Sequence, residues 1–266
     1  MNKTPKIADL LNYAASRTLQ RRTLLLLLAL MAGVISGMLF APAYQLVNET
    51  MEILNSVPDA TAQERAAKLI SENWQQAALG YLLYTLLTAG LLVAWARAVA
   101  ATNLLPFDGN IQQMFVRTIR SFWHIILANL VLAAAMLFGG AILVSLASAA
   151  GTIAMVLVFA GVFAMVWLAI TINAVANLAV MMEAQDHPLS LAIALQMMRP
   201  YARSAVASLG VVFLLAFVAN ILLSSLQASF GLDHDRLWLV ASGAVGFAAS
   251  AVHIAALTFF SFDRVK

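Results

Sequence analysis

Five polar side chains stand within stretches of this chain that are otherwise apolar, and they are its first candidates for chemistry. Asn173 and Asn177 are four residues apart, so a helix would place both on one face. The other three are Asn129, Asn220 and His253. Polar groups inside hydrocarbon are costly, which makes them default candidates for a substrate or ion path. Hydrogen bonding between helices, which sets helix register, is the alternative.

Histidine raises the question of a metal or proton site. His253 and His124 both fall toward the same predicted side of the membrane. A structural zinc site usually has four protein ligands and a catalytic one three, and the carboxylates that would complete such a set are missing from these stretches. The chain also contains no cysteine. We therefore expect no metal site, and a hydrogen-bonded or snorkelling histidine instead.

Motifs for nucleotide binding, acyl transfer and zinc proteolysis are absent from the sequence. It contains no Gly-x-x-x-x-Gly-Lys, no Gly-x-Ser-x-Gly and no His-Glu-x-x-His. The acid, base and nucleophile pairs that an enzyme needs are missing as well. We expect no enzymatic activity, no catalytic residue and no cofactor.

The elements that must position these side chains follow from one long stretch. Ser121 to Met182 contains no Asp, Glu, Lys or Arg, and its one natural break is at 148–152. A helix rises ~1.5 Å per residue and the hydrocarbon core of a bilayer is ~30 Å thick, so this stretch is too long for one crossing and suits two. It predicts a transmembrane helical hairpin with a short uncharged turn.

The composition agrees with a membrane protein. The chain is 63% hydrophobic and 10% charged, with a mean hydropathy of +0.90, whereas soluble domains are roughly 25% charged. The pI near 9.4 could indicate nucleic acid. The basic residues flank apolar spans, however, so membrane orientation explains them better and we expect no nucleic-acid partner.

The whole pattern predicts an all-α polytopic membrane protein with six transmembrane helices in a single domain, residues 1–266. The expected spans are 23–44, 74–95, 121–146, 152–180, 201–226 and 237–260, with an outside loop at 45–73. Within that loop, Thr61 to Glu64 fits a capping box, so its second half is expected to be helical, with Pro58-Asp59 as the turn between two short helices. Trp74 and Trp95 bracket the second span, as interfacial anchors do.

Short amphipathic segments precede the first, third and fifth spans. They begin near Thr4, Asn110 and Asp186, and we expect each to be an in-plane helix on the cytosolic face. The third, 189–198, also alternates as a strand would, but an open strand edge is costly beside lipid. The order "amphipathic segment, then two spans" occurs three times, which suggests a three-fold parallel repeat. Any six-span protein with in-plane linkers would show the same order, so both interpretations stay open.

Small residues recur at helical spacing on two spans. Gly33 and Gly37 lie on the first span, and Ser242, Gly246 and Ser250 on the sixth. Such spacing allows the backbone of another helix to approach closely. It indicates either self-association or internal packing, and the oligomeric state is left open.

The lysines and arginines predict the orientation. All but three of the 15 fall on the amino-terminal side of the membrane; the three on the other side are Arg65, Lys68 and Arg236. Because positive residues stay inside, both termini are expected in the cytoplasm.

The arrangement resembles the YciC-like bacterial inner-membrane proteins and the membrane domain of some glycerophosphodiester phosphodiesterases. The resemblance spans nearly the whole chain and rests on the placement of the in-plane helices and on two stretches, Pro188–Arg203 and Phe259–Lys266. The end reads Phe-Asp-Arg where an Asp-Leu-Arg order is expected. The resemblance implies a six-helix domain in the cytoplasmic (inner) membrane, and the family has no established catalytic residues to carry over.

From these observations we expect a non-enzymatic envelope or transport accessory that engages the lipid bilayer or a protein partner at its cytosolic face. The alternative is a transporter, either the permease half of an ATP-driven system or a small secondary carrier, with Asn173 and Asn177 lining the path. The missing intramembrane carboxylates argue against proton or sodium coupling.

Overall fold

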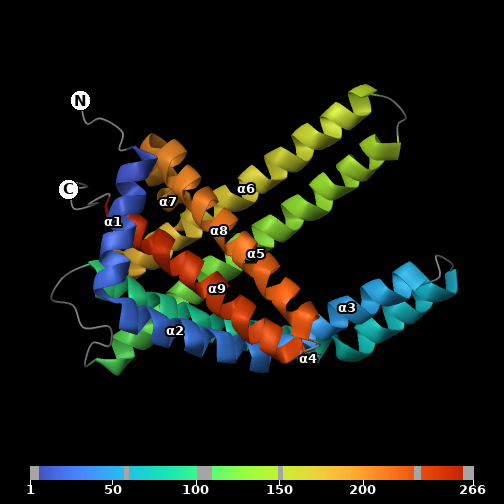
Figure 1. The fold of residues 1–266 in the computed structure, drawn as a ribbon, viewed down its shortest axis with the longest axis horizontal. Coiled ribbons are helices and arrows are strands. Elements are labelled where there is room, and N and C mark those ends of the chain that lie inside the picture. Colours follow the sequence, from blue (N-terminus) through green and yellow to red (C-terminus); the bar gives the residue numbers. More distant parts are fainter. Residues whose placement is uncertain (1–5, 57–59, 101–109, 149–151, 231–234, 260–266) are drawn as a thin grey trace.

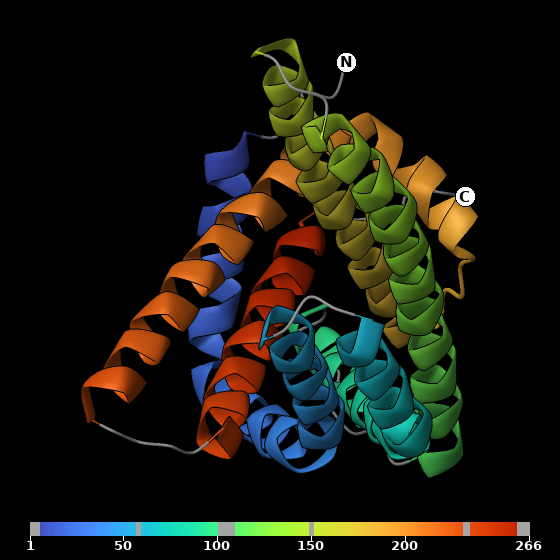
Figure 2. The ribbon, with the colours of Figure 1, turned by 90° about the vertical axis from the view of Figure 1, so that its right-hand side faces the viewer.

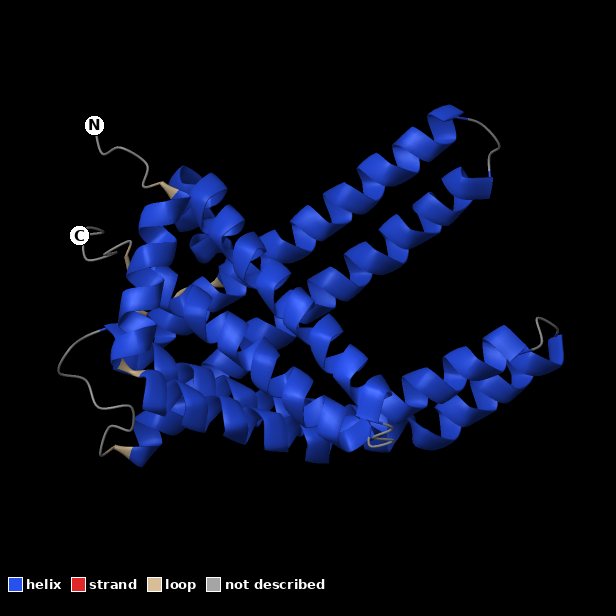
Figure 3. Cartoon of the chain, in the orientation of Figure 1, coloured by secondary structure: helices blue, strands red, loops and turns tan. Residues whose placement is uncertain are grey.

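The chain is built from helices. The computed structural model describes residues 6–56, 60–100, 110–148, 152–230 and 235–259. No strand occurs in these ranges (Figure 3). A bilayer contains no water to satisfy backbone groups, and helices meet that demand within each segment. The predicted all-α class is confirmed.

The elements follow one another without long connections within the described ranges. In chain order they are α1 (Ile7–Gln20), α2 (Arg22–Ile35), the π-helical stretch η1 (Ser36–Phe40), α3 (Ala41–Ser56), α4 (Ala60–Ala100), α5 (Ile111–Ser148), α6 (Thr152–Ala184), α7 (Leu191–Met198), the 3-10 turn η2 (Arg199–Tyr201), α8 (Ala202–Phe230) and α9 (Asp235–Leu257).

Six of the described helical segments are long and apolar enough to cross a membrane. They are Arg22–Asn55, Thr61–Ala100, Ile111–Ser148, Ala154–Ala184, Leu191–Ser225 and Leu237–Leu257. Each contains the corresponding predicted span or most of it. The chain is therefore a multi-pass membrane protein, as its composition predicts.

The predicted outside segment at 45–73 is helical on both sides of residues 57–59, as expected for two short helices joined by a turn, and both helices are continuous with the neighbouring spans. The first span continues through η1 into α3 as far as Ser56, and α4 begins at Ala60 and runs without a break to Ala100. The capping-box expectation of a helix in the second half is confirmed, while the predicted turn at Pro58-Asp59 lies outside the described residues. Glu, Gln, Ala, Leu and Lys favour helix, which explains why both parts of this hydrophilic segment are helical.

The three amphipathic segments differ in outcome. α1 and α7 are separate short helices, and α7 settles the helix-or-strand question for 189–198 in favour of helix. Ser190 caps α7 by accepting a hydrogen bond from the backbone N of Ile193 at 3.3 Å. The segment at 111–122 is instead the first part of the continuous helix α5, because neither Gly nor Pro interrupts it. Of the expected helix starts, Thr4 lies outside the described residues. Asn110 caps α5, because its Oδ1 accepts a hydrogen bond of 3.2 Å from the backbone N of Gln113.

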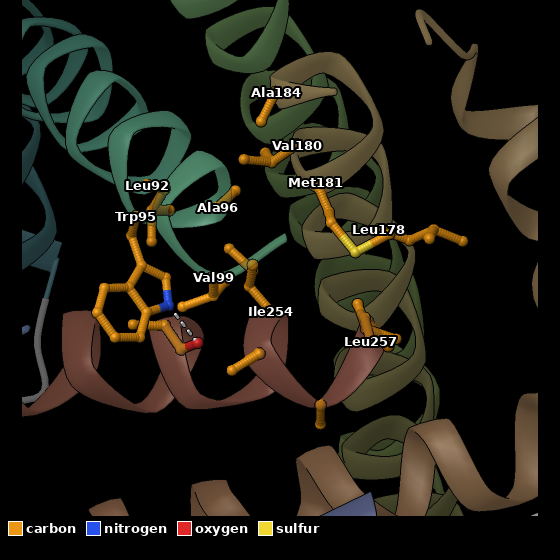
Figure 4. Packing of buried hydrophobic residues seen from close by; sticks show 14 of the residues in the cluster. Leu92, Trp95, Ala96, Val99, Leu178, Val180, Met181, Ala184, Ile254 and Leu257 are labelled. Atoms are coloured by element: carbon orange, nitrogen blue, oxygen red, sulfur yellow. Dashed lines mark hydrogen bonds between the residues drawn. The ribbon is translucent and has the colours of Figure 1, made fainter. Parts of the chain in front are cut away.

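The apolar core lies where α4, α6 and α9 cross (Figure 4). Trp95 of α4 is fully buried there, and its indole Nε1 donates a hydrogen bond of 2.7 Å to the carbonyl oxygen of Ala251 on α9. The expected role of Trp95 as an interfacial anchor is therefore wrong, whereas Trp74, 53% exposed, fits that role. This hydrogen bond satisfies the buried indole N–H and joins two helices that are far apart in the sequence.

The helices spread away from this core. Figure 1 shows the α3–α4 and α5–α6 hairpins diverging from the end of the molecule that holds α1 and α7, and Figure 2 shows the same separation from the side. In the most apolar 18-residue stretch of α5 and in that of α6, no residue is buried inside the protein. Leu137, Phe138 and Phe163 are among the exposed side chains. An apolar surface of this extent is what lipid tails cover.

Some of the small residues bring α2 and η1 into close contact with α9. A Cβ added at Gly33 of α2 would collide with the backbone carbonyl oxygen of Val240 on α9, and one at Gly243 would collide with the side chain of Ser36. Gly246, in contrast, has open space around it. The close contact that the Gly33 spacing predicts is thus made within this chain.

Candidate functional site: an intramembrane polar pocket and a charge cluster

Three of the predicted polar residues surround one pocket, which we call the intramembrane pocket. It has a volume of about 170 Å³ and lies between α4, α5, α6 and α9. Its polar lining consists of Tyr81, Tyr84, Thr85 and Thr88 from α4, Asn129 from α5, Asn173 and Asn177 from α6, and Ser250 from α9. One water needs ~10–15 Å³ of such space, so the pocket has room for a small solute.

The α4 side of the pocket consists of hydroxyl groups. The Nδ2 of Asn129 donates a hydrogen bond of 2.8 Å to the hydroxyl oxygen of Tyr81, which joins α5 to α4. Thr85 is buried and donates to the backbone oxygen of Tyr81 at 2.8 Å. These bonds hold the polar groups of α4 and α5 in defined positions facing the pocket.

The α6 side of the pocket carries the two asparagines. Asn173 donates through Nδ2 to the carbonyl oxygen of Ala169 in its own helix at 2.9 Å. Asn177 is buried, and its Nδ2 lies 3.1 Å from Nδ1 of the fully buried His253 on α9. The amide is the donor in this pair, so Nδ1 of His253 accepts and its proton is assigned to Nε2.

The lining determines what the pocket can hold. Among the described residues that line it, there is no Asp, Glu, Lys, Arg or His. Hydroxyl and amide groups satisfy the hydrogen bonds of an uncharged polar molecule, whereas an ion would lose its hydration without a compensating charge. The intramembrane pocket therefore suits a small, neutral, polar solute.

Two of the predicted residues, Asn220 and His253, do not line the intramembrane pocket. Asn220 on α8 donates to the carbonyl oxygen of Ala216 at 3.0 Å and lines a separate pocket with Ser224 and Trp238. His253 does not line the intramembrane pocket itself but supports it through Asn177. The two histidines have different partners, since His124 pairs with Glu183. No group of three or more His, Cys, Asp or Glu residues that could hold a metal ion occurs in the described part of the chain.

The four α4 hydroxyl residues were not among the predicted site residues. They follow a helical pattern, at positions 81, 84, 85 and 88, that places them on one face. Tyrosine and threonine are common in membrane helices and attract less attention than asparagine. Their spacing is nonetheless a polar stripe within an apolar span, and that signal was present in the sequence.

A second group of polar residues, the charge cluster, joins α4, α5 and α6 near the carboxyl end of α6. It consists of Arg97 from α4, Arg117, Arg120 and His124 from α5, and Glu183 and Asp186 from the end of α6. Arg117 is buried and binds both oxygens of Asp186, with Nε 2.8 Å from Oδ1 and Nη2 2.9 Å from Oδ2. Paired donors of this kind give an arginine–carboxylate contact its strength and direction.

Glu183 is the buried acid of the charge cluster. Its Oε1 lies 3.3 Å from Nε2 of His124, and its Oε2 lies 3.8 Å from Nη1 of Arg120. Arg97, also buried, donates to the carbonyl oxygen of Ala184 at 3.0 Å. A cation at the carboxyl end of α6 is favoured by the helix dipole. Together these contacts tie α4 and α5 to the end of α6.

Asp186 adopts a left-handed backbone conformation, with φ of 63°. Aspartate tolerates this region better than most residues. The turn after α6 thereby brings the carboxylate to Arg117, at a sequence separation of 69 residues. From the sequence, Asp186 was predicted only as the start of the next segment, because nothing local indicates a partner so distant along the chain.

Comparisons with protein-family models, with curated proteins and with solved structures find no match to this chain.

Proposed function

We propose that this chain is a non-enzymatic membrane transport protein that binds a small, uncharged polar solute in the intramembrane pocket. The observation that supports the proposal is the convergence of Asn129, Asn173 and Asn177 with the α4 hydroxyls around one pocket without charged lining. Most of the path for such a solute would lie within apolar helices. A pocket that replaces water hydrogen bonds lowers the cost of crossing them.

Asn173 gives the sharpest test of this proposal. Its described hydrogen bond is to its own helix, so the substitution Asn173→Leu removes a polar group from the pocket without breaking a contact between helices. Asn220→Leu is the matched control, because it changes the same residue type on a helix that lines another pocket. Uptake of radiolabelled glycerol and urea into proteoliposomes is the measurement.

We expect faster uptake of at least one solute with the wild-type protein than with empty liposomes. Asn173→Leu should remove the increase, and Asn220→Leu should retain it, while both variants remain monodisperse and helical. Uptake equal to that of empty liposomes for both solutes would overturn the proposal, as would equal loss in both variants.

An accessory role at the membrane is the second candidate. The charge cluster favours it, because its exposed charges lie beside an apolar helix face that points outward. In this role the protein would present α1, α7 and the first part of α5 to lipid or to a partner. Intact folding together with no solute uptake would leave this candidate as the better one.

The proposed location is the cytoplasmic (inner) membrane, with both termini and the charge cluster on the cytoplasmic side. This part of the proposal is supported by the distribution of Lys and Arg. The resemblance to YciC-like proteins implies the same location.

A further inference from the structure

A pocket of about 500 Å³ opens at the charge cluster and is separate from the intramembrane pocket. The first turns of α5 and the end of α6 form it, and its charged lining consists of Arg117, Arg120, Glu183 and Asp186. Its remaining polar lining comes from Asn110, Gln112 and Gln113. The solute pocket proposed above does not use any of these residues.

The charges of this pocket balance, but two of them remain accessible. Arg117 and Glu183 are buried, whereas the side chain of Arg120 is 54% exposed and that of Asp186 is 65% exposed. Arg120 is 3.8 Å from its described partner Glu183, which is longer than a hydrogen bond. Arg117 approaches Asp186 from one side and leaves much of the carboxylate facing solvent. The pocket therefore offers one accessible cation and one accessible anion.

A ligand with separated opposite charges matches this lining better than an ion of either sign. A simple anion would meet the carboxylates of Glu183 and Asp186, and a simple cation would meet Arg117 and Arg120. Like charges placed together cost affinity, so both are disfavoured. A phosphate next to Arg120 and an ammonium next to Asp186 would each meet the opposite charge.

The surroundings of the pocket indicate a lipid. Trp123, one turn beyond Arg120 on α5, is exposed, as are Leu127 and Leu130 further along the same helix. Tryptophan gathers at the level of lipid headgroups, and exposed apolar side chains beside it face lipid tails. The pocket thus lies where a headgroup can enter while its tails stay beside α5.

We propose that this pocket binds the headgroup of a zwitterionic phospholipid with a primary ammonium group. The phosphate of the headgroup lies against Arg120, and the ammonium of the headgroup donates hydrogen bonds to Asp186. Phosphatidylethanolamine has this chemistry. Phosphatidylcholine has the same charges but no N–H to donate, and phosphatidylglycerol lacks the ammonium, so the three headgroups separate the contributions of the two residues.

Native mass spectrometry of the purified full chain can count bound lipid in an equimolar mixture of these three lipids with identical tails. We expect the wild type to bind phosphatidylethanolamine about tenfold more tightly than phosphatidylcholine, as one charge-assisted hydrogen bond implies. Arg120→Gln should weaken binding of both. Asp186→Asn should remove the difference between them.

Arg203→Gln is the matched control, because Arg203 is exposed on α8 and does not line the pocket. It should bind lipid as the wild type does. A melting curve for each variant separates lost binding from lost folding. Since Arg120 is exposed, its variant is expected to fold even where the Asp186 variant does not.

Three results would overturn the proposal: equal binding of the three lipids, an equal loss of binding in Arg120→Gln and Arg203→Gln, and displacement of bound lipid by micromolar free phosphoethanolamine. The last would assign the pocket to a soluble zwitterion that needs no tails. Lipid binding unaffected by Asn173→Leu would show that this pocket acts apart from the intramembrane pocket.

Discussion

Asn177 and His253 join α6 to α9 by a hydrogen bond of 3.1 Å between Nδ2 and Nδ1, at a point where both residues are buried. The two residues are 76 positions apart in the sequence. Asn177 also lines the intramembrane pocket. The same amide therefore contributes to the packing of two helices and to the shape of the candidate solute site.

Replacing both partners of this bond should cost less than the two single changes predict. Asn177→Leu and His253→Leu each leave a buried polar atom without its partner, while the double variant removes both. Hydrogen bonds between membrane helices have coupling energies of roughly 0.6 kcal/mol on average, and we expect at least that value here. The free energy of unfolding of the wild type, the two single variants and the double variant, measured in mixed micelles with increasing dodecyl sulfate, gives this coupling energy as a double-mutant cycle. Additive single effects would show that the bond contributes nothing.

Two glycines should respond in opposite ways to alanine. Gly33→Ala places a methyl group against the backbone of Val240, so α2 and α9 must separate and the protein should lose roughly 1–3 kcal/mol of stability. Gly246→Ala meets open space and should be neutral or stabilise by up to about 1 kcal/mol through helix propensity. Melting temperatures in detergent give the comparison. Equal losses at both positions would contradict the close α2–α9 contact.

The two partners of the Arg117–Asp186 ion pair should differ in how much stability is lost when each is replaced. Asp186→Ala leaves a buried guanidinium without its carboxylate and is expected to cost about 1–3 kcal/mol. Arg117→Met leaves a carboxylate that is largely exposed and can be hydrated, so it should cost less. Lys68→Met, which removes an exposed pair with Glu72 at 3.9 Å, is the control and should change stability little. An equal or larger loss for Arg117→Met would mean that the arginine is not effectively buried.

The orientation can be tested with a fluorescent protein that folds only in the cytoplasm. Fused after Lys266 it should fluoresce, and inserted at residues 57–59, between α3 and α4, it should not. The opposite pattern would reverse the assignment of the charge cluster to the cytoplasmic side. Fluorescence at both sites would contradict the crossings between them.

The sequence by itself determined the class of this protein, because solvent preference is a local property that adds up along the chain. Uncharged stretches such as Ser121–Met182 can only be membrane helices, and six helical segments of sufficient length are found. Local signals also predicted the cap at Asn110 and the helix after Thr61. They did not predict that the amphipathic segment at 111–122 is continuous with the span that follows it, since the ends of helices depend on small differences in propensity.

Only the tertiary structure decided which polar groups meet. Asn129, Asn173 and Asn177 could be chosen from their cost in hydrocarbon, but nothing local distinguished them from Asn220, which faces another pocket. The partners Tyr81 and Asp186 lie 48 and 69 residues from Asn129 and Arg117, respectively. Such pairings follow from how α4, α5 and α6 cross. The crossing is set by the packing of whole helix faces, which no single segment of the sequence contains.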